Sequence, residues 1–224
     1  AGSPNAETTP FEVNSIEGSN PNLKRDWNGH MGNVAKANKL IVNIDKVTDP
    51  SLSDAEKRQY KAEAKILRGM IYFDMVRIWG NVPLITTEAG DITSETIEEV
   101  YPAYFPPQTD ALTIYKQIEE DLLEGLQYAP DNNPQDKTQF SKSVARALLA
   151  KMYAEKPLRD YDKVIQYADE LAKDGFDLIP DFGDMFEVVL VDPNLPPSQA
   201  NRAIDAKARN TRESIFEAQF SSNE

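Results

Sequence analysis

Apolar residues recur at every third or fourth position along much of the chain, which is the spacing of amphipathic helices. The first such run begins at Trp27 and ends near Val47, just before an Asp-Pro pair that disfavours helical backbone. A longer run follows a Ser-x-x-Glu capping box at Ser53 and stops at Gly80. The pattern therefore predicts two long helices, over residues 27–47 and 54–79.

The rest of the chain shows the same periodicity in shorter segments. Further helices are predicted over residues 115–129, from Ser141 or Ser143 to Tyr153, and over residues 160–173 and 198–209. The segment from Ser214 to Phe220 alternates apolar and polar residues, which instead predicts a half-buried strand. Residues 1–26 contain few apolar anchors and are predicted to form an irregular lead-in.

One part of the long helix is repeated later in the chain. Residues 64–72 align without gaps on residues 145–153, and the two segments share an alanine, a basic residue, a leucine, a small residue and a tyrosine. The spacing of Gly69 and Tyr72 is typical of tetratricopeptide helices, in which the small residue lets a neighbouring helix approach. We therefore predict an all-α fold: a short α-solenoid of degenerate tetratricopeptide-like helix pairs with long irregular loops.

This helical domain is expected to occupy residues 27–224. The strand predicted at its C-terminal end has no partner in the sequence, so the domain is expected to be truncated there. No uncharged apolar run approaches the length that a bilayer-spanning helix needs.

The connection from residue 81 to residue 108 is the strongest candidate for a binding element. Connections of this length within a compact domain are usually functional or disordered. Tyr101, Tyr104 and Phe105 lie among its prolines, where exposed rings can stack on the apolar faces of sugars or on a partner surface. These three residues and Trp27 are the candidate ligand-binding residues. The alternative for the loop is that its rings cap the edge of the solenoid.

Composition removes most other classes of function. The chain has 37 acidic and 24 basic residues and a formal net charge of −13, whereas nucleic-acid binding requires clustered basic residues. With no cysteine and one histidine, His30, it lacks the usual ligands of a zinc site and the redundancy for a catalytic triad. Carboxylate runs such as Glu119-Glu120-Asp121 are typical of a solvated helix face. We therefore predict no cofactor, metal or catalytic residue. Together with the aromatic loop, this favours a binding protein rather than an enzyme.

Polar residues within the apolar stripes have structural interpretations. Asn38 lies mid-helix among apolar neighbours, where its side chain is expected to fix a loop backbone by hydrogen bonds. Arg68 and Arg77 are expected to pack their stems on apolar surface and to pair with carboxylates. His30 is expected to be a cap or a hydrogen-bonding residue of the core.

Taken in order, several segments resemble blocks of the SusD/RagB family. The early blocks are Trp27–Met31 with Ala37-Asn38, residues 64–73, and Trp79-Gly80-Asn81-Val82-Pro83-Leu84. The later blocks are Tyr115 to Leu122, Lys142 to Ala150, Tyr161-Asp162, and Glu213-Ser214-Ile215-Phe216. Each block alone is short, but their order across most of the chain makes the resemblance specific.

The resemblance implies the N-terminal half of a surface lipoprotein of Bacteroidetes. Such proteins capture glycans, or in some members peptides, and cap a SusC-like TonB-dependent transporter. The expected location is the extracellular face of the outer membrane, with membrane contact only through a lipid anchor absent from this chain. Ligand residues vary across the family, so the resemblance adds none to those named above.

The leading prediction is therefore glycan capture for uptake, without bond cleavage. Two alternatives stay open: peptide cargo in the same kind of complex, and a helical-repeat module whose acidic surface docks a partner protein.

Overall fold

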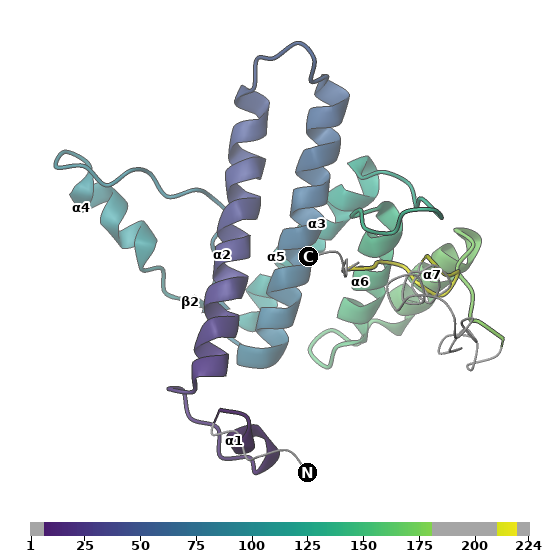
Figure 1. The fold of residues 1–224 in the computed structure, drawn as a ribbon, viewed down its shortest axis with the longest axis horizontal. Helices are drawn as coiled ribbons and strands as arrows, with labels where there is room; N and C mark the ends of the chain where they lie inside the picture. The colour runs from purple at the N-terminus through teal and green to yellow at the C-terminus, as the bar shows by residue number, and fades with distance from the viewer. Residues whose placement is uncertain (1–6, 181–209, 219–224) are drawn as a thin grey trace, which may run out of the picture.

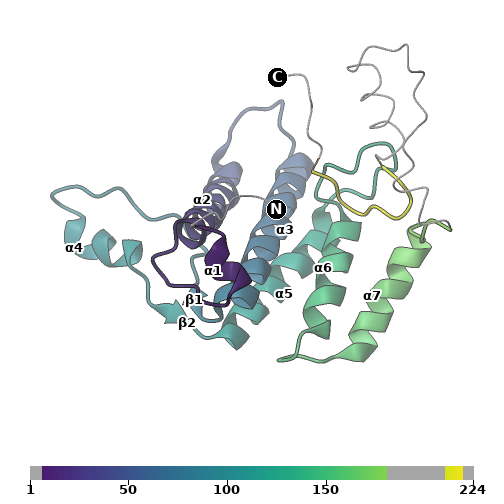
Figure 2. The same cartoon turned by 60° about the horizontal axis from the view of Figure 1, so that its bottom comes forward.

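The computed structural model describes residues 7–180 and 210–218, and in these ranges the chain is a row of helices packed side by side (Figures 1 and 2). The helices are α1 (Thr9–Glu12), α2 (Pro21–Asn43), α3 (Asp54–Trp79), α4 (Ile97–Val100), α5 (Ala111–Tyr128), α6 (Lys142–Ala154) and α7 (Tyr161–Lys173). Short 3-10 turns η1 (Ile44–Lys46) and η2 (Tyr101–Tyr104) follow α2 and α4, and strands β1 (Val82–Pro83) and β2 (Gln108–Thr109) pair antiparallel.

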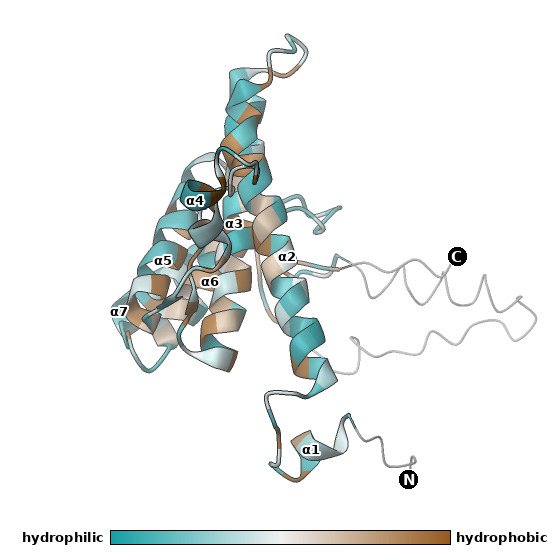
Figure 3. Ribbon diagram, turned by 90° about the vertical axis from the view of Figure 1, so that its left-hand side faces the viewer, coloured by the Kyte–Doolittle hydropathy of each residue, from teal (hydrophilic) through white to brown (hydrophobic). Residues whose placement is uncertain are grey.

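The main helices stack in chain order, which is the arrangement of a solenoid. α3 packs between α2 and α5, and α6 packs between α5 and α7. Figure 2 shows this succession, with α4 projecting from the side of the row where α2 lies. Hydrophobic and hydrophilic residues alternate along the helices in Figure 3, as expected where each helix buries one face. The predicted all-α fold of tetratricopeptide-type helix pairs is confirmed.

Side-chain caps explain where the helices begin. The capping box predicted at Ser53 is present: the Glu56 carboxylate accepts from the Ser53 amide at 2.8 Å, and the Ser53 hydroxyl accepts from the Glu56 amide at 3.3 Å. Asp110 and Asp160 cap α5 and α7 in the same way, by accepting hydrogen bonds from backbone amides in the first turn.

The irregular lead-in predicted for residues 1–26 is wrong from Pro21 onward. α2 begins there because the Asn20 side chain accepts from the Asn22 amide at 2.9 Å, and proline at the first helical position needs no hydrogen-bond partner. The polar composition of this first turn hid the start signal. A further short helix, α1, lies within the predicted lead-in.

The strand predicted over residues 214–220 is also wrong in its described part, which contains no strand. Phe216 stacks on Phe140 with ring centroids 4.8 Å apart, and the Glu217 amide donates to the Lys137 carbonyl at 2.9 Å. The alternating apolar residues therefore reflect docking on the connection between α5 and α6. The helix predicted over residues 198–209 lies outside the described residues.

Small residues set the spacing between α3 and α5. A Cβ atom on Gly69 would lie 3.3 Å from Leu122 Cδ2, in agreement with the role predicted for the small residue of the repeat. The approach is closer at Gly125, where a Cβ atom would lie 2.4 Å from Ile66 Cγ1. Each helix therefore contributes one glycine to the close contact between them: Gly69 on α3 and Gly125 on α5.

Gly125→Ala is expected to lower the free energy of unfolding by about 1–2 kcal/mol. Overpacking costs about 1–3 kcal/mol, and the better helix propensity of alanine returns up to about 1 kcal/mol. Urea denaturation measures the change. The matched control is Gly32→Ala in α2, where nothing lies within 4 Å of the added Cβ atom and a gain is expected. An equal gain in both variants would show that the α3–α5 contact is not tight.

Candidate functional site

The connection between α3 and α5 is a loop whose two ends are tied together. β1 and β2 pair Val82 with Thr109, and the Asn81 side chain accepts from the Ala111 amide at 3.1 Å. The chain between these anchors leaves the helical row and returns, with α4 and η2 at its far end (Figures 1 and 2). The aromatic residues predicted to bind a ligand therefore lie on an anchored loop that projects from the solenoid.

Two of the predicted residues form an exposed pair of rings on this loop. The centroids of Tyr101 and Phe105 are 4.9 Å apart and the ring planes are inclined at 48°. Tyr101 is 52% exposed and Phe105 is 68% exposed, so the rings contact each other and leave most of their surface in solvent. An uncovered aromatic pair can stack on an apolar ligand face.

The third residue, Tyr104, faces a hollow between the loop and α2. Its hydroxyl donates to the Gly90 carbonyl at 3.1 Å, which ties the two limbs of the loop together. The hollow has a volume of about 370 Å³, and Val34 and Ala35 of α2 line it opposite Ile85 of the loop. Its lining is mainly apolar, with the polar residues of α2 and of the loop's first limb completing it.

Trp27 occupies a different setting from the other three candidates. Its ring meets the Trp79 ring edge-on, with the ring centroids 5.3 Å apart. The His30 ring also meets the Trp79 ring edge-on, with the centroids 5.6 Å apart. Trp27 does not line the hollow described above. The structure therefore places Tyr101, Tyr104 and Phe105 on one loop and Trp27 in a half-buried aromatic cluster between α2 and α3. Ligand binding by all four residues stays a prediction.

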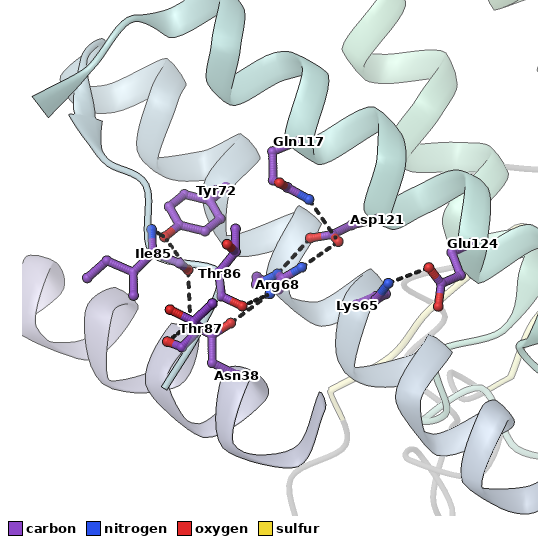
Figure 4. A network of polar contacts seen from close by, with 10 residues as sticks. All are labelled: Asn38, Lys65, Arg68, Tyr72, Ile85, Thr86, Thr87, Gln117, Asp121 and Glu124. Carbon is purple, nitrogen blue, oxygen red and sulfur yellow. Dashed lines mark hydrogen bonds and ion pairs between the residues drawn. The ribbon is translucent and has the colours of Figure 1, made fainter. Parts of the chain in front are cut away.

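A buried ion pair lies beneath the start of the loop (Figure 4). The Arg68 guanidinium donates two hydrogen bonds to the Asp121 carboxylate, at 2.8 and 2.7 Å, and so joins α3 to α5. It also donates to the Asn38 side-chain oxygen at 2.7 Å and to the Thr86 carbonyl at 3.1 Å. Burial raises the pKa of the Asp121 carboxyl, and the hydrogen bonds from Arg68 oppose that shift.

The same group of side chains holds the first limb of the loop. The Asn38 amide nitrogen donates to the Ile85 carbonyl at 2.9 Å and to the Thr87 carbonyl at 3.3 Å. The Tyr72 hydroxyl donates to the Ile85 carbonyl at 3.0 Å and accepts from the Ile85 amide at 2.7 Å. Burial raises the pKa of Tyr72, so this hydroxyl keeps its proton at neutral pH. The loop-fixing role predicted for Asn38 and the carboxylate pairing predicted for Arg68 are confirmed.

Asp121 is the part of this network that sequence reasoning placed wrongly. The acidic run at residues 119–121 was expected on a solvated face, yet Asp121 is 1% exposed. It follows Ile118 by one helical turn and precedes Leu122, so it falls on the buried stripe of α5. The position of Asp121 on this stripe was the signal from which its burial could have been predicted. Arg77 also pairs with a carboxylate as predicted, Glu155 at 2.9 Å.

Residues 7–180 and 210–218 contain no group of three or more histidine, cysteine or acidic side chains that could hold a metal ion. None of the helices in these ranges has the length and apolar character needed to cross a membrane. The arrangement is suited to holding a ligand against rings and an apolar hollow.

The chain is similar to known proteins of one family. The model of the family described as "Starch-binding associating with outer membrane" (SusD-like) matches residues 5–154. A SusD-like protein of Bacteroides ovatus is 29% identical over 189 residues, which cover 79% of this chain and 32% of that protein.

Solved structures show the same fold. A SusD-like protein of Bacteroides fragilis superposes with a TM-score of 0.69 at 24% identity, over 96% of this chain and 37% of that protein. A laminarin-binding SusD-like protein superposes with a TM-score of 0.66 at 25% identity, over 86% of this chain and 40% of that protein. The chain thus spans about a third of the length of its relatives, and with the family model matching most of it, this chain belongs to the SusD-like family.

Proposed function

We propose that this chain captures glycans at the extracellular face of the outer membrane, for uptake through a SusC-like TonB-dependent transporter. The observation that supports glycan binding most directly is the exposed ring pair, Tyr101 and Phe105, on an anchored loop beside the hollow. A relative with the same fold binds laminarin. The chain acts by binding alone and cleaves no bond.

The geometry of the rings suits a chain of sugars. Rings inclined at 48° present two faces at an angle, so consecutive sugar residues of a bent glycan can each lie on one ring. Tyr104 continues this surface towards the hollow, which it lines together with residues of α2. The loop contributes aromatic area for stacking, and carbonyls and hydroxyls around it supply hydrogen bonds to sugar hydroxyls.

Family membership supports the outer-membrane setting, and the resemblance to SusD/RagB proteins supports the transporter partner. The matching family is described as associating with the outer membrane. A lipid anchor on the full-length protein would place the helical row at the membrane surface, and the transporter would receive the captured glycan. Pull-down of the full-length protein with its transporter tests this part of the proposal separately from glycan binding.

Phe105→Ala is expected to weaken glycan binding about tenfold, because loss of one stacking ring removes about 1–1.5 kcal/mol of interaction. Isothermal titration calorimetry of the chain against laminarin oligosaccharides, other neutral and acidic glycans and a peptide digest measures the affinity. The matched control is Tyr161→Ala on α7, a ring that is 59% exposed and remote from the loop. Equal losses in both variants, or none in either, would contradict a glycan site on this loop.

Peptide cargo is the second candidate, and the hollow is the observation that favours it. A mainly apolar cavity of about 370 Å³ accommodates an apolar side chain more readily than a hydroxylated sugar. Binding of the peptide digest, and of no glycan in the panel, would replace the first proposal with this one.

A further inference from the structure

We propose that Asn38 is a positioning residue of the hollow: together with Tyr72 and Arg68 it fixes the wall formed by residues 85–87, and it thereby sets ligand affinity without touching the ligand. For affinity, the inference rests on the binding function proposed above. The positioning of the wall itself does not depend on that function.

The orientation of the Asn38 carboxamide is determined by its partners. A guanidinium group can only donate hydrogen bonds, so the Asn38 atom 2.7 Å from Arg68 Nη1 must be the oxygen. The nitrogen then faces the carbonyls of Ile85 and Thr87, at 2.9 and 3.3 Å. Arg68 is held in turn by its two bonds to Asp121. The helical core therefore aims both N–H groups of Asn38 at the loop.

Asn38 connects the hollow to that core directly. It is 1% exposed and yet lines the hollow, together with Ile85 and Thr87, the residues whose carbonyls it binds. The Ile85 and Thr87 carbonyls thus point at Asn38 of α2 (Figure 4). Both of these wall residues line the hollow. If the hydrogen bonds from Asn38 are lost, residues 85–87 can move, and the hollow then loses its shape.

The side chain has no donor left for a ligand. Both N–H groups of Asn38 are used by the loop carbonyls, and its oxygen accepts from Arg68. Its effect on binding must therefore act through the fraction of molecules whose wall is in place, since apparent affinity falls in proportion to that fraction.

The test compares the wild-type chain with Asn38→Leu, which keeps the approximate volume and removes all three hydrogen bonds. Hydrogen–deuterium exchange is measured on peptides covering residues 85–90 and residues 114–122. We expect exchange at least about tenfold faster in residues 85–90 and unchanged in residues 114–122. The affinity for laminarin oligosaccharides should fall about tenfold, and saturating ligand should restore slow exchange in residues 85–90.

Two further variants keep the result interpretable. Asn38→Asp retains the oxygen that faces Arg68 and loses both N–H donors, so it decides the question if the leucine variant does not fold. Ser143→Ala removes another hydrogen bond of a side chain that is 1% exposed, 2.9 Å from Asp174 and remote from the loop. It should leave exchange in residues 85–90 and glycan affinity unchanged.

Unchanged exchange in residues 85–90 of the Asn38 variants would overturn the inference, as would an equal increase in Ser143→Ala. If the wild-type chain binds no glycan, the proposed function fails, while the exchange measurement still decides whether Asn38 holds the wall.

Discussion

Asp121→Ala is expected to lower the free energy of unfolding by about 3–5 kcal/mol, the largest effect of any single substitution considered for this chain. The substitution leaves the Arg68 guanidinium buried, with 4% of its side chain exposed, and without the carboxylate that balances its charge. Removing one partner of a buried pair costs more than the pair contributes, because the remaining charge stays desolvated. Urea denaturation followed by far-UV circular dichroism measures the loss.

Two controls distinguish burial from pairing. Asp131→Ala removes an exposed ion pair, in which the Asp131 side chain is 87% exposed and pairs with Lys142. This substitution should lower the free energy of unfolding by less than about 1 kcal/mol. The double variant Arg68→Met with Asp121→Leu removes both buried charges and should recover most of the stability that Asp121→Ala loses. A cost below about 1 kcal/mol for Asp121→Ala itself would mean that water reaches the pair.

Leu122→Ala is expected to lower the free energy of unfolding by about 2–5 kcal/mol. Leu122 is fully buried, and its side chain fills the space between α5 and α3 beside Gly69. Truncation leaves a cavity there, because the two helices are also held at Gly125 and cannot close the gap. The same denaturation experiment measures the effect.

Gly69→Ala should affect stability differently in the wild type and in Leu122→Ala. In the wild type, the added Cβ atom lies 3.3 Å from Leu122, so the leucine must give way and stability should fall or stay level. In Leu122→Ala, the same methyl group enters the cavity, and a gain of about 1–2 kcal/mol is expected. Additive effects of the two substitutions would show that Gly69 and Leu122 do not share one space.

The stability of the helical core and the shape of the candidate site depend on the same residues. Asp121 orients Arg68, Arg68 orients Asn38, and Asn38 holds the loop wall. Weakening the ion pair should therefore loosen residues 85–90 before the helices separate. Comparing hydrogen exchange with global unfolding in the Arg68→Met and Asp121→Leu double variant separates the two effects, because that variant keeps the core but lacks the contact that orients Asn38.

Local chemistry was enough to predict several parts of the fold. The capping box at Ser53 and the stop at Gly80 bound α3 as observed, since both depend on residues adjacent in sequence. The start of α2 was missed, because the Asn20 cap lies in a largely polar stretch in which Leu23 is the one large apolar side chain before Trp27. The terminal strand was mispredicted because an alternating pattern also arises when a segment such as the one containing Phe216 docks on a loop.

Only part of the candidate site could be predicted from the sequence. Exposed aromatic residues in a proline-rich loop can be recognised from composition, and Tyr101, Tyr104 and Phe105 were found on that ground. The hollow could not be predicted, because it lies between α2 and a loop far along the chain. Its polar support could be anticipated residue by residue, for Asn38 and Arg68, but not as a connected network.

The sequence by itself determined the main helices apart from the start of α2, their tetratricopeptide-like repeat and the resemblance to the SusD-like family, because periodicity, caps and motif order are properties of neighbouring residues. Only the tertiary structure decided which acidic residue is buried, which carbonyls Asn38 binds, and that Trp27 packs on Trp79 apart from the loop rings. These depend on how α2, α3 and α5 stack, and that stacking brings together residues whose separation in sequence leaves no local pattern.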